Sequence, residues 1–237
     1  MKTVAPAMLF LMLSPLFAQQ DRETAKIRGD WSSKTVSLFN TWGGFDSNPG
    51  RRFIFFSPDK KKKVEVTGDK VWLFVGSKKF DAHLQDKTNA ELGWSPDSTR
   101  FFLTWTDGGS TGSWHVQVYE VSDHGLTELK GIENEARKDF EARIRELPPY
   151  KGRDSNVWAT QEYCEASVVG SEWLARSSQL LVSVLVPPTS ACRYMTKFDV
   201  YRIDIPSGKI LQRYTAREAH RKFNSADLPK IGLLETD

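Results

Sequence analysis

The sequence predicts an all-β fold that is built from repeated antiparallel units and interrupted by one amphipathic α-helix. A turn of the form aromatic-Ser-Pro-Asp occurs twice, 38 residues apart, and each copy is followed by an alternating apolar strand. The only clear helical periodicity lies between residues 131 and 147. These observations favour an array of similar β units with a single helical insertion.

The N-terminal residues 1–18 predict a secretory signal peptide that is cleaved after Ala18. Lys2 supplies the positive start, and residues 7–13 form a short apolar stretch that ends at Ser14-Pro15. A membrane span needs about 20 apolar residues, so no transmembrane segment is expected in the mature chain; an N-terminal core helix is the alternative. We therefore expect a periplasmic or secreted bacterial protein with one domain, residues 19–237.

The charge composition of the chain limits the classes of partner that it is expected to bind. There are 33 Lys and Arg residues against 30 Asp and Glu, a formal net charge of +3. Such a balanced chain lacks the strong positive field that gathers nucleic acid, so no nucleic-acid partner is expected. Arg51, Arg52 and Lys60–Lys63 could form a basic edge that touches anionic polymers or phospholipid head groups, although lysines also protect sheet edges from pairing.

The first two units lie near residues 51–80 and 92–125. Residues 55–66 (FFSPDKKKKVEV) correspond to residues 93–104 (GWSPDSTRFFLT). Proline fixes φ for the turn, and Asp or Ser bonds to the backbone just ahead, so Asp59 and Asp97 are interpreted as turn caps. The aromatic residue, Phe56 or Trp94, ends one strand and is expected to pack in the core.

A third, degenerate unit lies near residues 170–214. Trp173 follows Trp94 by 79 residues, about two repeat periods, and a strand over 198–205 follows later in the unit. Residues 34–39, together with material from the end of the chain, could supply a fourth unit. Otherwise the sheets stay open, or an oligomer completes them.

The Trp-Ser-Pro-Asp turn of residues 94–97 and the Val-Tyr-x-x-Asp-x-x-Ser-Gly segment of residues 200–208 resemble a known repeat. They are similar to the WD-like β-propeller repeats of periplasmic Tol-system and related exported bacterial proteins, over roughly residues 51–125 and 170–214. The resemblance implies β-propeller-like antiparallel blades, three of them recognisable, in a ring that can be incomplete. Propellers of this kind include scaffolds, ligand-binding modules and non-catalytic domains of peptidases.

The segment 131–147 predicts the inserted helix. Apolar residues recur at helical spacing among charges, and Pro148-Pro149 ends the pattern; these residues are Ile132, Ala136, Phe140, Ile144 and Leu147. We expect this stripe to pack on a sheet edge or ring face. Docking of a partner on the helix is the alternative.

The two cysteines, Cys164 and Cys192, are expected to form a disulfide in an oxidising compartment. Two buried free thiols or a redox pair are alternatives, and the close Cys-x-x-Cys spacing that redox chemistry favours is missing.

Residues 108–112 (GGSTG) satisfy the Gly-x-Ser-x-Gly pattern of a serine hydrolase. That pattern positions a nucleophile only on a strand-to-helix turn, and here it lies between two expected strands, so Ser110 is not expected to be catalytic. The histidines, His83, His115, His124 and His220, show no metal-ligand spacing. We expect no catalytic residue, no metal and no cofactor.

Trp105 and Trp114 flank the glycine loop and are the expected binding residues, because exposed aromatic rings suit stacking on sugars or clamping a peptide. Core packing is the alternative for both. The sequence thus predicts an exported, non-catalytic binding or scaffolding module for a protein, peptide or glycan of the cell envelope. A subunit that docks on an envelope assembly and a serine hydrolase of cell-wall or peptide substrates are the rival interpretations.

Overall fold

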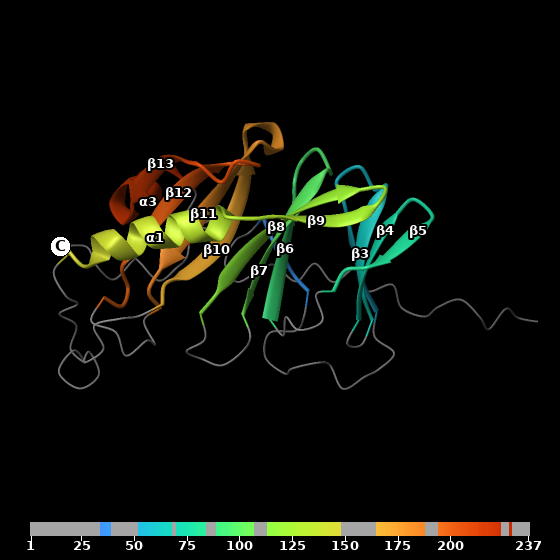
Figure 1. Cartoon of the computed structure of the whole chain (residues 1–237), viewed down its shortest axis with the longest axis horizontal. Helices are drawn as coiled ribbons and strands as arrows, with labels where there is room; N and C mark the ends of the chain where they lie inside the picture. The colour runs from blue at the N-terminus through green and yellow to red at the C-terminus, as the bar shows by residue number, and fades with distance from the viewer. Residues whose placement is uncertain are drawn as a thin grey trace, which may run out of the picture.

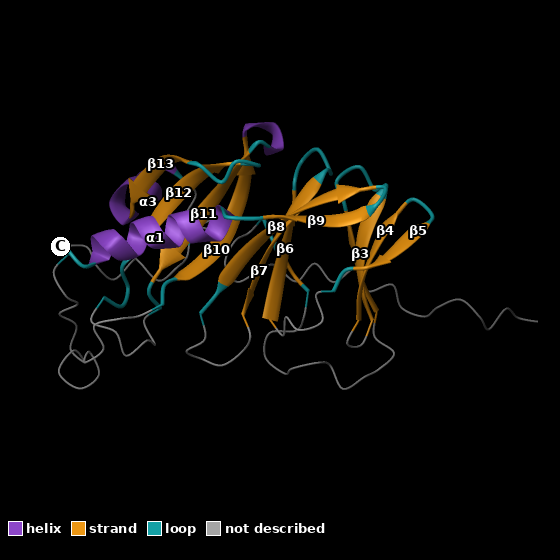
Figure 2. Ribbon diagram, in the orientation of Figure 1, coloured by secondary structure: helices purple, strands orange, loops and turns teal. Residues whose placement is uncertain are grey.

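The computed structural model describes residues 34–38, 52–67, 70–83, 89–106, 113–147, 165–187, 194–223 and 228. These residues are mostly β and form three antiparallel sheets, with two α-helices and one short 3-10 turn, residues Ala175–Ser177 (Figure 2). None of the described helices is long and apolar enough to cross a membrane. The predicted signal peptide lies outside the described residues.

Each sheet corresponds to one predicted unit, and we name the sheets accordingly. Unit 1 has the order β2(Arg52–Phe56), β3(Lys62–Thr67), β4(Lys70–Val75) and β5(Lys78–Asp81). Unit 2 has the order β1(Val36–Ser37), β6(Asn89–Trp94), β7(Arg100–Thr106), β8(His115–Ser122) and β9(Gly125–Leu129). Unit 3 has the order β10(Ser167–Leu174), β11(Gln179–Leu185), β12(Phe198–Asp204) and β13(Ile210–Thr215).

Four consecutive strands in each unit pair with their neighbours in the chain, which is the meander of a propeller blade. The predicted all-β class is therefore confirmed. The suggested fourth unit is wrong, because Val36 pairs with Leu92 and adds β1 to the free edge of β6 in unit 2. Within the described ranges the three sheets stand side by side without closing into a ring (Figure 1).

The Ser-Pro-Asp turns have the same internal bonds in units 1 and 2. The Ser57 hydroxyl donates to Asp59 at 2.6 Å, and the Ser95 hydroxyl donates to Asp97 at 2.7 Å. The hydrogen bond from Ser57 lowers the pKa of Asp59. Burial opposes ionisation of Asp97, but hydrogen bonds from Ser95 and from the residue after the turn outweigh it and lower its pKa too. Both aspartates are thus turn caps.

Apolar side chains fill the spaces between the units. The cluster between units 1 and 2 includes Val64 and Leu73 on one side and Leu92 and Phe101 on the other. Phe102, on the opposite face of β7, joins the cluster between units 2 and 3. Successive side chains of β7 point to opposite faces of the sheet, and both faces are buried, so the neighbouring phenylalanines contribute to two different interfaces.

The inserted helix α1(Ile132–Ile144) fills the outer part of the space between units 2 and 3. Its apolar stripe, Ile132, Ala136, Phe140 and Ile144, is buried against β8 and against strands β10–β12. The inclusion of Leu147 in this stripe was wrong: the helix ends at Ile144, and Leu147 is 40% exposed.

The far face of unit 3 is covered by the second helix, α3(Ala216–Lys222). Thr215 and Glu218 form a capping box at its start. Ala219 of α3 and Leu228 pack on the buried strand residues of this face, which include Val169, Leu181, Val200 and Tyr214. Unit 3 is therefore covered on both faces.

Candidate functional site

The predicted binding residues, Trp105 and Trp114, are both half-buried and contact different parts of the core. The Trp105 ring stacks on His115 with 4.9 Å between centroids and packs on the cluster between units 1 and 2. Trp114 packs on the cluster at the far face of unit 3, and its carbonyl accepts from Val168 N at 2.8 Å. Their role in binding stays a prediction.

Two other predicted features lie outside the described residues. These are the glycine loop with Ser110, and the disulfide between Cys164 and Cys192. In the part of the chain that the structure does describe, no three His, Cys, Asp or Glu side chains gather closely enough to hold a metal ion.

A charged cluster around His115 fixes the start of α1 to unit 2. The Glu133 carboxylate accepts from His115 Nδ1 at 2.9 Å and from Val116 N at 3.0 Å, and it pairs with Arg137. Strand β9 pairs with β8 only as far as Val118, so Glu133 satisfies a backbone N–H beyond the end of the strand pairing. Arg137 also pairs with Glu165 at 3.0 Å. The structural role of this charged cluster is therefore to position α1 against unit 2.

A second cluster fixes the other end of α1 to unit 3. Tyr201 donates its hydroxyl hydrogen to Asp139 at 2.9 Å, and Arg143 pairs with Asp199. Burial, together with the hydrogen bond to Asp139, raises the pKa of Tyr201 well above its ordinary value. The charged side chains on this face of α1 thus connect units 2 and 3.

The repeated aromatic position identifies a face of unit 1 on which no other described unit packs. Trp173 of unit 3 donates from Nε1 to the Gly93 carbonyl of unit 2 at 2.9 Å, so it packs on the unit before it. Trp94 of unit 2 likewise packs on the cluster that it shares with unit 1. Phe56, the third member, is 51% exposed. The expectation that Phe56 packs in the core is wrong, because no described unit precedes unit 1.

Two further positions on this face change from apolar to charged. Phe101 and Leu103 of unit 2 are fully buried against unit 1. Leu180 and Val182 occupy the same repeat positions in unit 3 and are also fully buried. In unit 1 these positions hold Lys63 and Glu65.

Strand register defines the whole face. One row across the strands consists of Phe56, Lys63, Phe74 and Lys79. The next row consists of Ile54, Glu65, Trp72 and Asp81. We call these eight residues the outer face of unit 1; it forms the end of the described structure opposite unit 3 (Figure 1).

Lysines lie over the aromatic rings of the outer face. Lys79 Nζ is 3.7 Å from the Trp72 ring centroid and 5.8 Å from that of Phe74. Lys63 Nζ is 4.2 Å from the Phe74 centroid and 3.0 Å from a Glu65 carboxylate oxygen. Such cation–π contacts hold the ammonium groups on the apolar surface; Lys63 is also neutralised by Glu65, whereas the exposed Lys79 keeps its charge accessible to solvent or a partner.

Hydrogen bonds between successive turns join unit 1 to unit 2 and unit 2 to unit 3, and the outer face of unit 1 offers no equivalent acceptor at the same turn position. Asp59 N donates to Ser98 Oγ at 3.0 Å, and at the equivalent place Asp97 N donates to Ser177 Oγ at 3.2 Å. The corresponding residue of unit 1 is Lys60, which shares the positive φ of the two serines but has no hydroxyl to accept such a bond. The outer face therefore lacks the features that join one unit to the next.

The expected basic edge is divided between two places. Lys62 Nζ donates to the Ser98 carbonyl at 2.7 Å and so connects units 1 and 2, whereas Lys63 lies on the outer face. Lys60 and Lys61 remain exposed at the turn. These lysines are adjacent in the sequence, but the geometry of the strand and the turn places them on different surfaces.

The fold and the site thus define a mostly β protein of three blade-like sheets, with one end face on which no other described unit or helix packs. No protein-family model matches the chain, and no curated protein matches it. A solved structure assigned as TolB from Agrobacterium tumefaciens is 14% identical with a TM-score of 0.34, over 70% of this chain and 46% of that one. One assigned as a 6-phosphogluconolactonase from Bacteroides uniformis is 14% identical with a TM-score of 0.32, over 69% and 40%.

The chain spans less than half the length of each of these two proteins. Similarity at this level assigns neither a family nor a function, and the blade-like description rests on the strand order alone.

Proposed function

We propose that the chain is a non-catalytic binding module that docks another macromolecule on the outer face of unit 1. The observation that carries this proposal is the 51% exposure of Phe56 at a repeat position whose other two members pack on a neighbouring unit. A large aromatic side chain at the end of a sheet stack is energetically favoured when a partner removes it from water.

The composition of the face supports docking. It combines four large apolar residues with four charged ones, whereas the core between units is almost entirely apolar. Protein interfaces combine aromatic anchors with surrounding polar groups in this way. The far face of unit 3, in contrast, is covered by the chain's own helix α3.

The partner is proposed to belong to the cell envelope, because residues 1–18 have the pattern of a secretory leader. An envelope protein, peptide or glycan then has access to the outer face. Covalent labelling of Ser110 by a fluorophosphonate probe would contradict the non-catalytic part of this proposal.

Photo-crosslinking in the native cell tests the docking surface. A photoreactive phenylalanine analogue replaces Phe56 in one variant and Leu211 in another; Leu211 is also a large exposed apolar residue, at 40%, but lies on β13 of unit 3. We expect a discrete adduct of higher mass from position 56 and none from position 211. Equal adducts from both positions, or none from position 56, would contradict the proposal.

A further inference from the structure

We infer that the outer face of unit 1 binds an acidic amphipathic helix of a partner protein. Carboxylates of that helix would pair with Lys70 and Lys79, while its apolar side chains would contact Phe56 and the half-buried rings beside it. This inference rests on the proposed docking function and adds the chemical class of the partner.

The charges on and around this face favour a negatively charged partner. The outer face itself carries two lysines and two carboxylates, and Glu65 is already paired with Lys63, so the exposed lysines on this side of unit 1 decide the charge that a partner meets. Lys79 contacts only aromatic rings in the described part of the chain, and Lys70, two rows away on the same face, is exposed without an ion pair there. Asp81 is already engaged by His83, whose backbone N donates to it at 2.8 Å.

The spacing of the face suits a helix. Neighbouring strands lie about 4.8 Å apart, so the row from Phe56 to Lys79 alternates apolar and cationic side chains at that interval. An α-helix advances about 5.4 Å per turn. A helix that crosses the strands therefore places about one residue of each turn over each strand. If these residues, spaced three or four apart in its sequence, alternate between apolar and acidic, the apolar ones face the rings of the row and the acidic ones face its lysines.

The other sheet faces of the chain provide a precedent. Helix α1 buries its apolar stripe against units 2 and 3, and α3 covers the far face of unit 3. Among the described residues, the outer face of unit 1 is a sheet face that receives no helix. A helix supplied by a partner would complete the same arrangement.

Two other anionic ligands fit the face less well. Single-stranded nucleic acid stacks its bases on open aromatic rings, but Lys79 and Lys63 already lie over Trp72 and Phe74. An anionic bilayer would take up Phe56, but the ion pair of Lys63 and Glu65 in the middle of the face would then lie against lipid. A helix can instead place a polar side chain opposite Glu65.

Fluorescence anisotropy with synthetic probes tests the inference on the full chain. The probe is an 18-residue labelled peptide in which Leu and Glu alternate at one-turn spacing, and its control carries Lys in place of Glu. We expect the acidic peptide to bind more tightly than the basic one, and to lose affinity as salt is raised. Oligothymidine and phosphatidylglycerol vesicles are tested in parallel.

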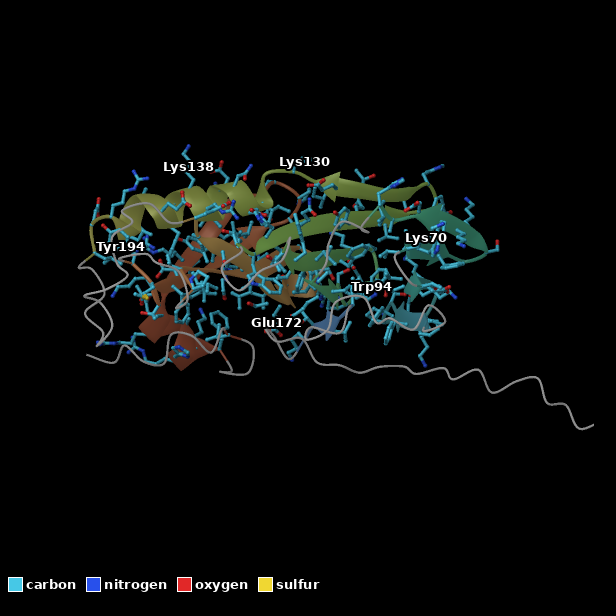
Figure 3. The ribbon with its side chains drawn as sticks, turned by 90° about the horizontal axis from the view of Figure 1, so that it is seen from below. Lys70, Trp94, Lys130, Lys138, Glu172 and Tyr194 are labelled. Atoms are coloured by element: carbon cyan, nitrogen blue, oxygen red, sulfur yellow. The ribbon has the colours of Figure 1, made fainter. Side chains whose placement is uncertain are left out.

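Charge reversal locates the site. The double variant K70E/K79E should weaken binding of the acidic peptide about tenfold, because two attractions become repulsions. The matched variant K138E/K209E changes the net charge equally at exposed lysines on α1 and near β13, and it should leave binding within about twofold. Figure 3 shows Lys138 on α1, far from Lys70.

Preference for the basic peptide, or equal weakening of binding by both double variants, would overturn the inference. So would a result in which the acidic peptide does not bind, while vesicles or oligothymidine bind in a way that depends on Lys70 and Lys79. If Phe56 still crosslinks a partner in cells under those outcomes, the docking function stands and only the partner chemistry is wrong. If crosslinking from position 56 is also absent, both proposals fail.

Discussion

Replacing Gly170 with alanine should weaken the packing between units 2 and 3. The ring of Phe102, which is 1% exposed, lies against Gly170 of unit 3 and Gly93 of its own unit. A Cβ atom on Gly170 would come within 2.5 Å of Phe102 Cδ2, and a Cβ on Gly93 within 2.4 Å of Cζ. With backbone on both sides the ring has no room to move away, so we expect a loss of about 1–3 kcal/mol in the free energy of unfolding.

Urea denaturation followed by tryptophan fluorescence measures this loss, and thermal melting should show a decrease of roughly 3–9 °C. The matched test introduces G170A into an F102L background, where the smaller side chain leaves room for the new methyl group. There G170A should cost less than about 1 kcal/mol, since the two sites are in direct contact. An equal cost in both backgrounds would refute the claim that the ring is the obstacle.

Three further predictions concern the contacts between elements. Ser177→Ala removes the acceptor of Asp97 N and should lower the free energy of unfolding by about 1 kcal/mol in urea, whereas Ser178→Ala, at an exposed local bond, should cost less; equal costs would contradict the inter-unit role. Because the folded pKa of Asp97 lies below its unfolded value, its contribution is present above about pH 4 and is lost as the pH falls through the folded pKa. Melting temperatures between pH 2.5 and 6 should therefore fall less steeply for Asp97→Asn than for the native chain, and parallel curves would count against this assignment. Glu133→Gln should increase hydrogen exchange in α1 because it weakens the bonds to β8, whereas Glu135→Gln, at an exposed position, should leave exchange unchanged; an unchanged α1 in the first variant would show that its apolar stripe alone holds it.

The three units could be predicted from the sequence because short stretches of neighbouring residues specify their turns and strands. A Ser-Pro-Asp turn is specified by residues next to each other, so its two copies predict a strand, a turn and a second strand without any long-range information. The third copy lost that sequence but kept Trp173 and the alternating strand after it. The placement of residues 34–39 was wrong because the partner of a short edge strand depends on long-range pairing, which nothing local specifies.

The candidate site was missed because the sequence was examined for aromatic residues beside a glycine-rich loop. That criterion selected Trp105 and Trp114, while the outer face depends on Phe56 and Trp72. A signal was present in the aligned repeats, where Lys63 occurs at the position of buried Phe101. A charged residue in place of a core residue marks a unit whose neighbour is absent or different, but only the structure showed which repeat positions are buried.

The two ends of the array differ in a way that bears on function. The far face of unit 3 consists of residues such as Leu181 and Val200, whose exposure would be unfavourable, and α3 covers it within the same chain. On unit 1, Lys63 and Glu65 stand in place of buried apolar residues and pair with each other, although Glu65 is only 7% exposed. Burying these charges against a purely apolar surface would be unfavourable, so a partner must supply polar groups that match them. The proposed complex on the outer face of unit 1 is therefore expected to form and separate, whereas the apolar far face of unit 3 is favoured when α3 covers it.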